Sequence, residues 1–143
     1  MDNLQRASVS FSISDDNLNP TEISSLLGAE PSRGVRKGET FYGQQGRPVQ
    51  ARTGMWQIGS GYSTAPELDA QIAALLNRMT NNLEVWTKLT RRYNCYLSVG
   101  GWFNDWTGGF TLKAATLRLL GERGLSLDFD LYAPAASPPP PED

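Results

Sequence analysis

Two aspartates near the end of the chain are the residues most able to do chemistry. Asp128 and Asp130 lie two positions apart within residues 125–132, and side chains at that spacing on a strand share a face, about 6.5–7 Å apart. Carboxylates at such a separation serve some hydrolases and also suit Mg²⁺. Aspartates on a strand are equally typical of solubilising charges, and no lysine or third acid has a determined place beside this pair.

The composition restricts the chemistry further. The 143 residues include no histidine, which removes the commonest general base and the commonest metal ligand. The single cysteine, Cys95, has no partner for an internal disulfide and lies on the apolar side of an expected strand, so we expect a buried, inert thiol. We therefore assign no catalytic residue, metal ligand or cofactor, and the balance favours a protein that is not an enzyme.

The aspartates belong to an alternating segment that defines the architecture. In residues 125–132 the apolar side chains are Leu125, Leu127, Phe129 and Leu131, and polar residues stand between them. Residues 7–14 and 95–99 alternate in the same way. Parallel strands that are buried on both faces are instead continuously apolar, so this pattern predicts a sheet covered by helices on one side only.

The helices follow from caps and periodicity. Asn19 and Pro20 predict a helix over residues 20–27 that ends at Gly28. Residues 66–93 have a helical period that is interrupted at 80–82, which predicts two helices. A further helix is expected at 112–120, with four residues spaced for burial: Leu112, Ala115, Leu119 and Leu120. Residues 55–58 predict a strand that glycines end at 59, and residues 29–53 predict mostly loop with a brief edge strand at 39–42.

These elements predict one α+β domain over residues 1–133. It contains a mixed sheet of four or five strands, in an order that the sequence does not specify, with helices packed mainly on one face. Residues 134–143 are rich in proline and are expected to be a mobile tail. The chain begins without a signal-peptide pattern and contains no long apolar run, so a soluble cytoplasmic protein is expected.

Several stretches together resemble a known family. They are Leu27-Gly28 followed by Glu30-Pro31, then Arg36-Lys37-Gly38-Glu39, Trp56, and residues 127–132, LDFDLY. In this order and spacing the chain resembles the bacterial family catalogued as domain of unknown function 4279, over about residues 7–132. The resemblance implies a small soluble domain that mixes helices and strands, and it implies no established activity or catalytic residue.

A basic segment and an aromatic segment are candidate binding surfaces. Residues 33–52 carry a local charge of +4 on a chain of net charge −2. These basic residues are expected to form ion pairs with the acidic body, to be simply solvated, or to bind an anion or acidic partner. Trp102, Phe103 and Trp106 stand among four glycines in residues 100–109. They are expected either to anchor a partner or to cap one end of the core.

The polar sheet face is the third candidate surface. It should present Ser8, Ser10, Ser12, Tyr96, Ser98, Asp128, Asp130 and Tyr132. Such a face is either simply solvated or suited to hydrogen bonding in an interface. A nucleic-acid platform would place basic residues among the aromatics, so the acids on this face disfavour nucleic acid.

The leading functional hypothesis is a non-catalytic protein-binding module, of inhibitor or immunity type, whose partner is another protein and neither membrane nor nucleic acid. The alternatives are a binder of a small anionic or sugar-like ligand or a carboxylate-dependent hydrolase, and a structural homodimer. The candidate binding residues are Arg33, Arg36, Lys37, Trp56, Tyr96, Trp102, Trp106, Asp128, Asp130 and Tyr132.

Overall fold

The fold is a five-stranded mixed sheet with helices on one of its faces. The structure is a computed structural model that describes residues 4–64 and 66–134. The sheet has the strand order β2-β5-β1-β6-β7. Its strands are β1 (Leu4–Asp15), β2 (Arg33–Val35), β5 (Gly54–Thr64), β6 (Asn94–Phe103) and β7 (Ser126–Tyr132). The α+β class and the one-sided sheet are both confirmed.

Strand β1 lies at the centre of the sheet and organises the pairing. It is antiparallel to both β5 and β6, and β2 is antiparallel to β5 at one edge. At the other edge β7 is parallel to β6, because the chain between them crosses over through a helix and returns in the same direction.

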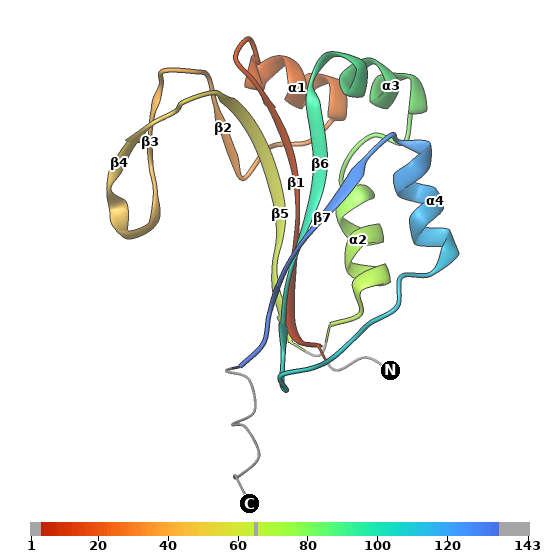
Figure 1. The fold of residues 1–143 in the computed structure, drawn as a ribbon. Coiled ribbons are helices and arrows are strands. Elements are labelled where there is room, and N and C mark those ends of the chain that lie inside the picture. The colour runs from red at the N-terminus through yellow and green to blue at the C-terminus, as the bar shows by residue number, and fades with distance from the viewer. Residues whose placement is uncertain (1–3, 65, 135–143) are drawn as a thin grey trace, which may run out of the picture.

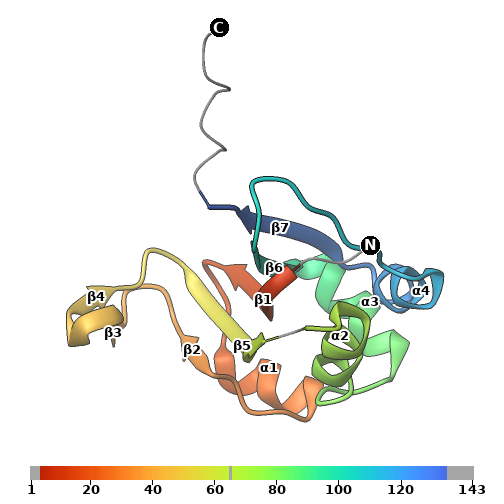
Figure 2. The same cartoon turned by 90° about the horizontal axis from the view of Figure 1, so that it is seen from below.

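The helices are α1 (Pro20–Leu27), α2 (Leu68–Leu76), α3 (Leu83–Arg92) and α4 (Ala114–Glu122). All four lie on the same side of the sheet, and no element of the described residues covers the other side (Figures 1 and 2). As predicted, the Asn19 side chain accepts a hydrogen bond from the Thr21 N–H, and Gly28 ends α1 with a φ of 66°. The predicted break between α2 and α3 is also present, with Asn82 capping α3.

The core lies between the helices and the sheet, with Phe11 at its centre. Its ring makes edge contacts with Trp86 at 5.3 Å and with Trp56 at 6.1 Å between centroids. Both indole N–H groups are satisfied inside the core, Trp56 by the Ser24 hydroxyl at 3.0 Å and Trp86 by the Thr80 carbonyl at 2.8 Å. Burial of these large rings with their polar atoms paired explains how a chain of this size stabilises a single layer of helices.

The segment expected to be mostly loop contains additional strands. The brief strand expected at 39–42 is present as β3 (Thr40–Tyr42). Besides β2, the segment also contains β4 (Pro48–Gln50), which forms a hairpin with β3 through the short 3₁₀ helix η1 (Gln44–Gly46). This hairpin, called the arm below, projects from the β2 edge away from the helices (Figure 2). Strand β5 also continues past Gly59 to Thr64, because an irregularity in its pairing with β1 accommodates one extra residue.

Two burial predictions near the C-terminus were wrong. Ala115 is exposed and Thr116 is buried instead, because Asp69 accepts hydrogen bonds from the Lys113 N–H and the Thr116 hydroxyl and so fixes the start of α4. Phe129 and Leu131 are each 45% exposed, because β7 is an edge strand and α4 covers only its beginning (Figure 1). The proposed tail, apart from Pro134, lies outside the described residues.

Candidate binding surface

The uncovered side of the sheet, called the open face below, is formed by strand positions of one parity, that is, by the alternate residues of each strand that point away from the helices. The pairing places Ser98 beside Asp128, Gly100 beside Asp130 and Trp102 beside Tyr132. Both aspartates are exposed, as expected for a face that carries no helix. Ser12 is an exception on this face: it is only 3% exposed, because its partners in the two neighbouring strands are the long side chains Gln57 and Tyr96.

Four side chains form a continuous aromatic cluster across one end of the open face. They come from four adjacent strands and are Arg6, Tyr62, Trp102 and Tyr132. The Arg6 guanidinium carbon lies 4.8 Å from the centre of the Tyr62 ring and 4.3 Å from that of Trp102. Trp102 stacks on Tyr132 with centroids 5.4 Å apart and contacts Tyr62 at 5.2 Å. Cation–π and stacking contacts of this kind hold all four side chains in defined positions.

The three aromatic residues of the glycine-rich segment have different places. Trp102 belongs to the open face, and its ring lies over Gly100, where an added Cβ would be 3.4 Å from the indole. Phe103 has the opposite parity and packs against Phe110 at 6.4 Å on the helix side. Trp106 lies beyond the strand and is 55% exposed. Only Phe103 therefore closes the end of the core, and the two tryptophans are surface residues.

A cleft of about 540 Å³ adjoins the aromatic cluster. Arg6, Trp102 and Tyr132 form part of its wall, together with Gln5, Thr64, Phe103, Ala133 and Pro134. The cleft thus has aromatic surfaces, one cation and several hydrogen-bonding groups. Clefts with this mixture of apolar and polar groups are typical of binding sites.

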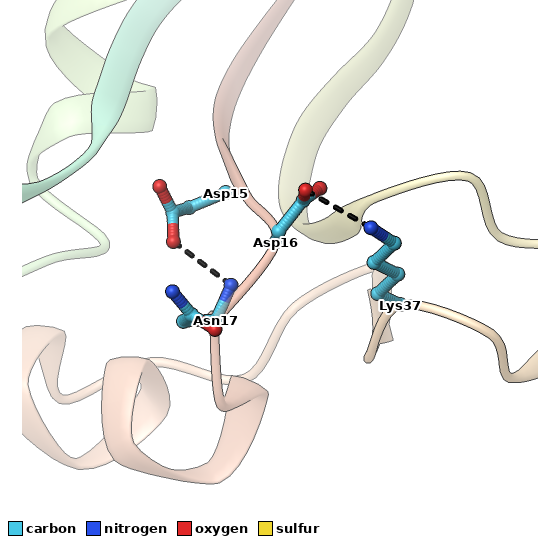
Figure 3. A network of polar contacts seen from close by, with 4 residues as sticks. All are labelled: Asp15, Asp16, Asn17 and Lys37. Atoms are coloured by element: carbon cyan, nitrogen blue, oxygen red, sulfur yellow. Dashed lines mark hydrogen bonds and ion pairs between the residues drawn. The ribbon is translucent and has the colours of Figure 1, made fainter.

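The basic residues near the arm are partly engaged in local contacts. Lys37 forms an ion pair with Asp16, with Nζ and Oδ2 3.0 Å apart (Figure 3). This hydrogen bond, together with a second one from the Thr53 side chain and the positive charge of Lys37, lowers the pKa of Asp16 below its usual value. The neighbouring Asp15 carboxylate accepts a hydrogen bond from the Asn17 N–H and so shapes the turn that presents Asp16 (Figure 3).

The two candidate arginines at this edge differ in their contacts. The Arg33 guanidinium lies 4.5 Å from the centre of the Phe41 ring. Arg36 is exposed, and its backbone N–H donates to the Glu39 carboxylate at 2.6 Å. The ion-pair interpretation therefore holds for Lys37, whereas Arg33 contributes to a surface with apolar neighbours.

An apolar groove of about 260 Å³ lies between the arm and the β2 edge. Arg33, Val35, Phe41 and Met55 are among its walls, together with Val49, Gln50, Ala51, Arg52 and Thr53. This groove could not be predicted from the sequence, because it forms only where β2, the arm and the start of β5 come together in the folded chain.

Two residues singled out from the sequence lie in the interior. The Trp56 side chain is 0% exposed, so it is a core residue and not part of a binding surface. Cys95 is buried, its thiol donates to the Leu89 carbonyl at 3.6 Å, and burial raises the pKa of the thiol to about 12. The prediction of an inert thiol agrees with this environment.

The structure does not bring all the candidate residues together. Arg33 is on β2 and Asp128 is on β7, at opposite edges of the sheet, so four strand spacings of about 4.8 Å, roughly 19 Å in all, separate them. Within residues 4–64 and 66–134, no group of three or more acidic or cysteine side chains is placed to hold a metal ion. No helix in the described part of the chain is long and apolar enough to cross a membrane.

The fold and surface define a small α+β domain with a one-sided sheet and a bare polar face that carries an aromatic cluster. The family model described as "Domain of unknown function (DUF4279)" matches residues 5–134, and the chain belongs to this family. Searches of curated proteins and of solved structures found no match.

Proposed function

We propose that this protein is a non-catalytic binding module that engages another protein through the open face of its sheet. The observation that carries the proposal is the aromatic cluster of Arg6, Tyr62, Trp102 and Tyr132. Tryptophan, tyrosine and arginine are the residue types that dominate the binding energy of protein interfaces. In this protein they are gathered on the face that the helices leave bare.

The exposure of these side chains and their mutual contacts support the same proposal. Tyr62 is 67% exposed and Tyr132 is 48% exposed, so both have large apolar surfaces to contribute to an interface. Their mutual contacts with Arg6 and Trp102 already restrict their rotamers. Preorganised side chains lose less conformational entropy on binding, which favours affinity.

The charges at the two edges would orient a partner on this face. Arg33 is on β2, Arg36 and Arg52 are in the segments that connect the arm to β2 and to β5, and Asp128 and Asp130 are on β7. A surface with separated charges of opposite sign favours one orientation of its partner. An inhibitor or immunity-type protein, which must recognise one effector, would use such a surface. The cytoplasm is the compartment that we propose, since the only cysteine is a buried free thiol.

Affinity capture from the source organism tests the proposal. The immobilised wild-type protein is compared with Trp102→Ala and Tyr132→Ala variants, and the captured proteins are identified by mass spectrometry. Leu117→Ala, which removes an exposed apolar side chain from α4 on the opposite side, is the matched control. We expect a partner that is retained by the wild type and the control and lost by both open-face variants.

The thermal stability of the same variants must be measured together with capture. Loss of the Trp102 contacts should lower the free energy of unfolding by about 0.5–1.5 kcal/mol per aromatic pair, which leaves the domain folded. A partner that binds all four proteins equally would overturn the proposal. A loss of capture that is matched by unfolding of the variants would also remove its support.

The cleft supports a second candidate, a small anionic or sugar-like ligand. Arg6, Trp102 and Tyr132 in its wall offer a cation and two ring faces, which suit an anion or the apolar face of a sugar. A thermal-shift screen of sugars, phosphates and carboxylates tests this candidate. A shift that Trp102→Ala abolishes would support it, and a full screen without a shift would exclude it.

A further inference from the structure

The two edges of the sheet differ in how well they are protected. Edge strand β2 has only three residues, Arg33–Val35, and it leads directly into the arm. Edge strand β7 has seven residues, Ser126–Tyr132, and within the described part of the chain it pairs only with β6. A long edge strand presents a row of backbone donors and acceptors on which an extended segment of another chain can add as a further strand.

The two faces of β7 carry different side chains, and an added strand would meet both of them at this edge. Phe129 and Leu131 face the helix side and are each still 45% exposed, although the Phe129 ring contacts that of Phe110 with centroids 5.7 Å apart. Leu125, just before the strand, is 8% exposed beside α4. The helix layer thus ends before the strand does. An added strand with apolar side chains on that face would cover Phe129 and Leu131.

On the open face the same strand carries two charges without local compensation. Asp128 and Asp130 are exposed, and neither forms an ion pair or side-chain hydrogen bond with any described residue. Their register neighbours on β6 are Ser98 and Gly100, which bring no positive charge. Basic side chains at alternate positions of an added strand would lie beside both carboxylates.

This charge pattern disfavours a second copy of the chain as the occupant. A two-fold axis through Phe129 would pair β7 with its copy in antiparallel orientation, and each Asp128 would then lie opposite an Asp130. Like charges directly opposite each other on neighbouring strands are destabilising. Inward or edge charges are also a common device against edge-to-edge association.

We propose that the outer edge of β7 accepts, by strand addition, an extended segment of the partner protein in which basic residues alternate with apolar ones. The basic side chains lie beside Asp128 and Asp130, and the apolar side chains cover Phe129 and Leu131. This inference rests on the proposed function, because it specifies the chemistry of the segment that the partner contributes. The aromatic cluster then contacts the rest of the partner at the end of the same face.

A capped heptapeptide of alternating lysine and valine is the probe for this edge. We expect it to bind the wild-type protein and to slow hydrogen exchange of alternate β7 amides. The Asp128→Asn/Asp130→Asn variant should bind it about fivefold to tenfold more weakly at low salt. Glu30→Gln/Glu67→Gln, which removes two exposed charges elsewhere, is the matched control and should bind like the wild type.

Two backbone-methylated versions of the peptide distinguish strand addition from simple charge attraction. One carries N-methyl groups on the edge that would pair with β7, and the other carries them on the opposite edge. Strand addition predicts that one version loses about tenfold or more in affinity and that the other binds normally. Equal binding by both, or equal binding to Asp128→Asn/Asp130→Asn, would overturn the proposal.

The proposal and the proposed function fail in different experiments. If Trp102→Ala abolishes capture of a partner but no segment of that partner protects β7 amides, the edge proposal is wrong and the binding function stands. If the peptide adds to β7 but Trp102→Ala captures the same proteins as the wild type, the edge proposal stands and the aromatic cluster is not the binding site. A dimer of the protein alone that protects the β7 amides would overturn the choice of occupant.

Discussion

The two faces of the central strands are built from neighbouring residues, yet they differ in burial and in side-chain chemistry. On β1, Val9 faces the helices and is 1% exposed, and Ser10 faces the open side and is half-buried. The helix side combines Phe11, Trp56 and Trp86 into a dry core. The open side carries hydroxyls, carboxylates and the aromatic cluster. Stability therefore resides on one face, and the other face is free to carry a binding surface at little cost to the fold.

The largest difference is expected between a tryptophan in the core and one on the surface. Trp86→Ala removes a side chain that is 0% exposed, together with its contact with Phe11 and its hydrogen bond to Thr80. It should destabilise the protein by about 3–5 kcal/mol. Trp106→Ala, at an exposed position, should change stability within about ±0.5 kcal/mol. Urea unfolding measures both, and similar losses for the two variants would contradict the comparison.

Thiol reactivity should also differ between the buried side of the sheet and the open face. Because the Cys95 pKa is raised to about 12 from a value of 9.0, its thiolate population at pH 8 should be about a thousandfold below that of an ordinary cysteine. Iodoacetamide should therefore modify Cys95 slowly in the folded protein and rapidly in urea. Ser126→Cys in a Cys95→Ala background places a thiol at an exposed position on the open face and should react rapidly without urea.

The raised pKa of Cys95 also determines the direction in which stability changes at alkaline pH. The folded state resists ionisation of Cys95, so its contribution to stability is complete below pH 9 and declines as the pH rises towards 12. Cys95→Ala should remove this part of the alkaline decline. An identical alkaline decline in both proteins would show that Cys95 is not responsible.

Neighbouring positions on β1 give a finer comparison. Val9→Thr keeps the shape of the side chain but introduces a hydroxyl into the core, which should cost about 1–3 kcal/mol. Ser10→Val, on the open face, should change stability within about ±0.5 kcal/mol. Chemical denaturation of the two variants measures this difference, and a larger loss for Ser10→Val would mean that the open face is covered.

The smallest effect concerns the ion pair of Lys37 and Asp16, where both side chains are more than half exposed. Lys37→Met should raise the pKa of Asp16 towards its usual value, because the main hydrogen-bond donor is lost. The contribution of Asp16 to stability is present above its unfolded pKa and declines as the pH falls through the folded value. Titration of the Asp16 carboxyl by NMR measures the shift, and an unchanged pKa would show that the pair is not maintained in solution.

Local sequence signals explain much of the fold. Asn19, Pro20 and Gly28 define α1 because caps act within one turn. The alternation in β1, β6 and β7 predicts which face is covered, because side-chain parity is a local property of a strand. The strand order and the arm depend on pairings between distant segments, so local patterns do not determine them.

Local patterns likewise predict only part of the aromatic cluster. Arg6 has the parity of Ser8 and Ser10, so extending the alternation of β1 backwards would have found it. Tyr62 has the parity of Trp56 and would be assigned to the core. The extra residue in β5, near Gly61 with its φ of 74°, moves Tyr62 to the open face opposite Ser8. A bulge of this kind changes the face of every later residue in the strand.

Hydroxyl-radical footprinting of the protein in solution tests the two-sided organisation most directly. The two-sided organisation predicts that Tyr62, Trp102 and Tyr132 are oxidised and that Trp56 and Trp86 are protected, over a range of protein concentrations. Protection of Trp102 and Tyr132 to the extent seen for Trp86, in the protein alone, would contradict it, because the open face would then already be covered.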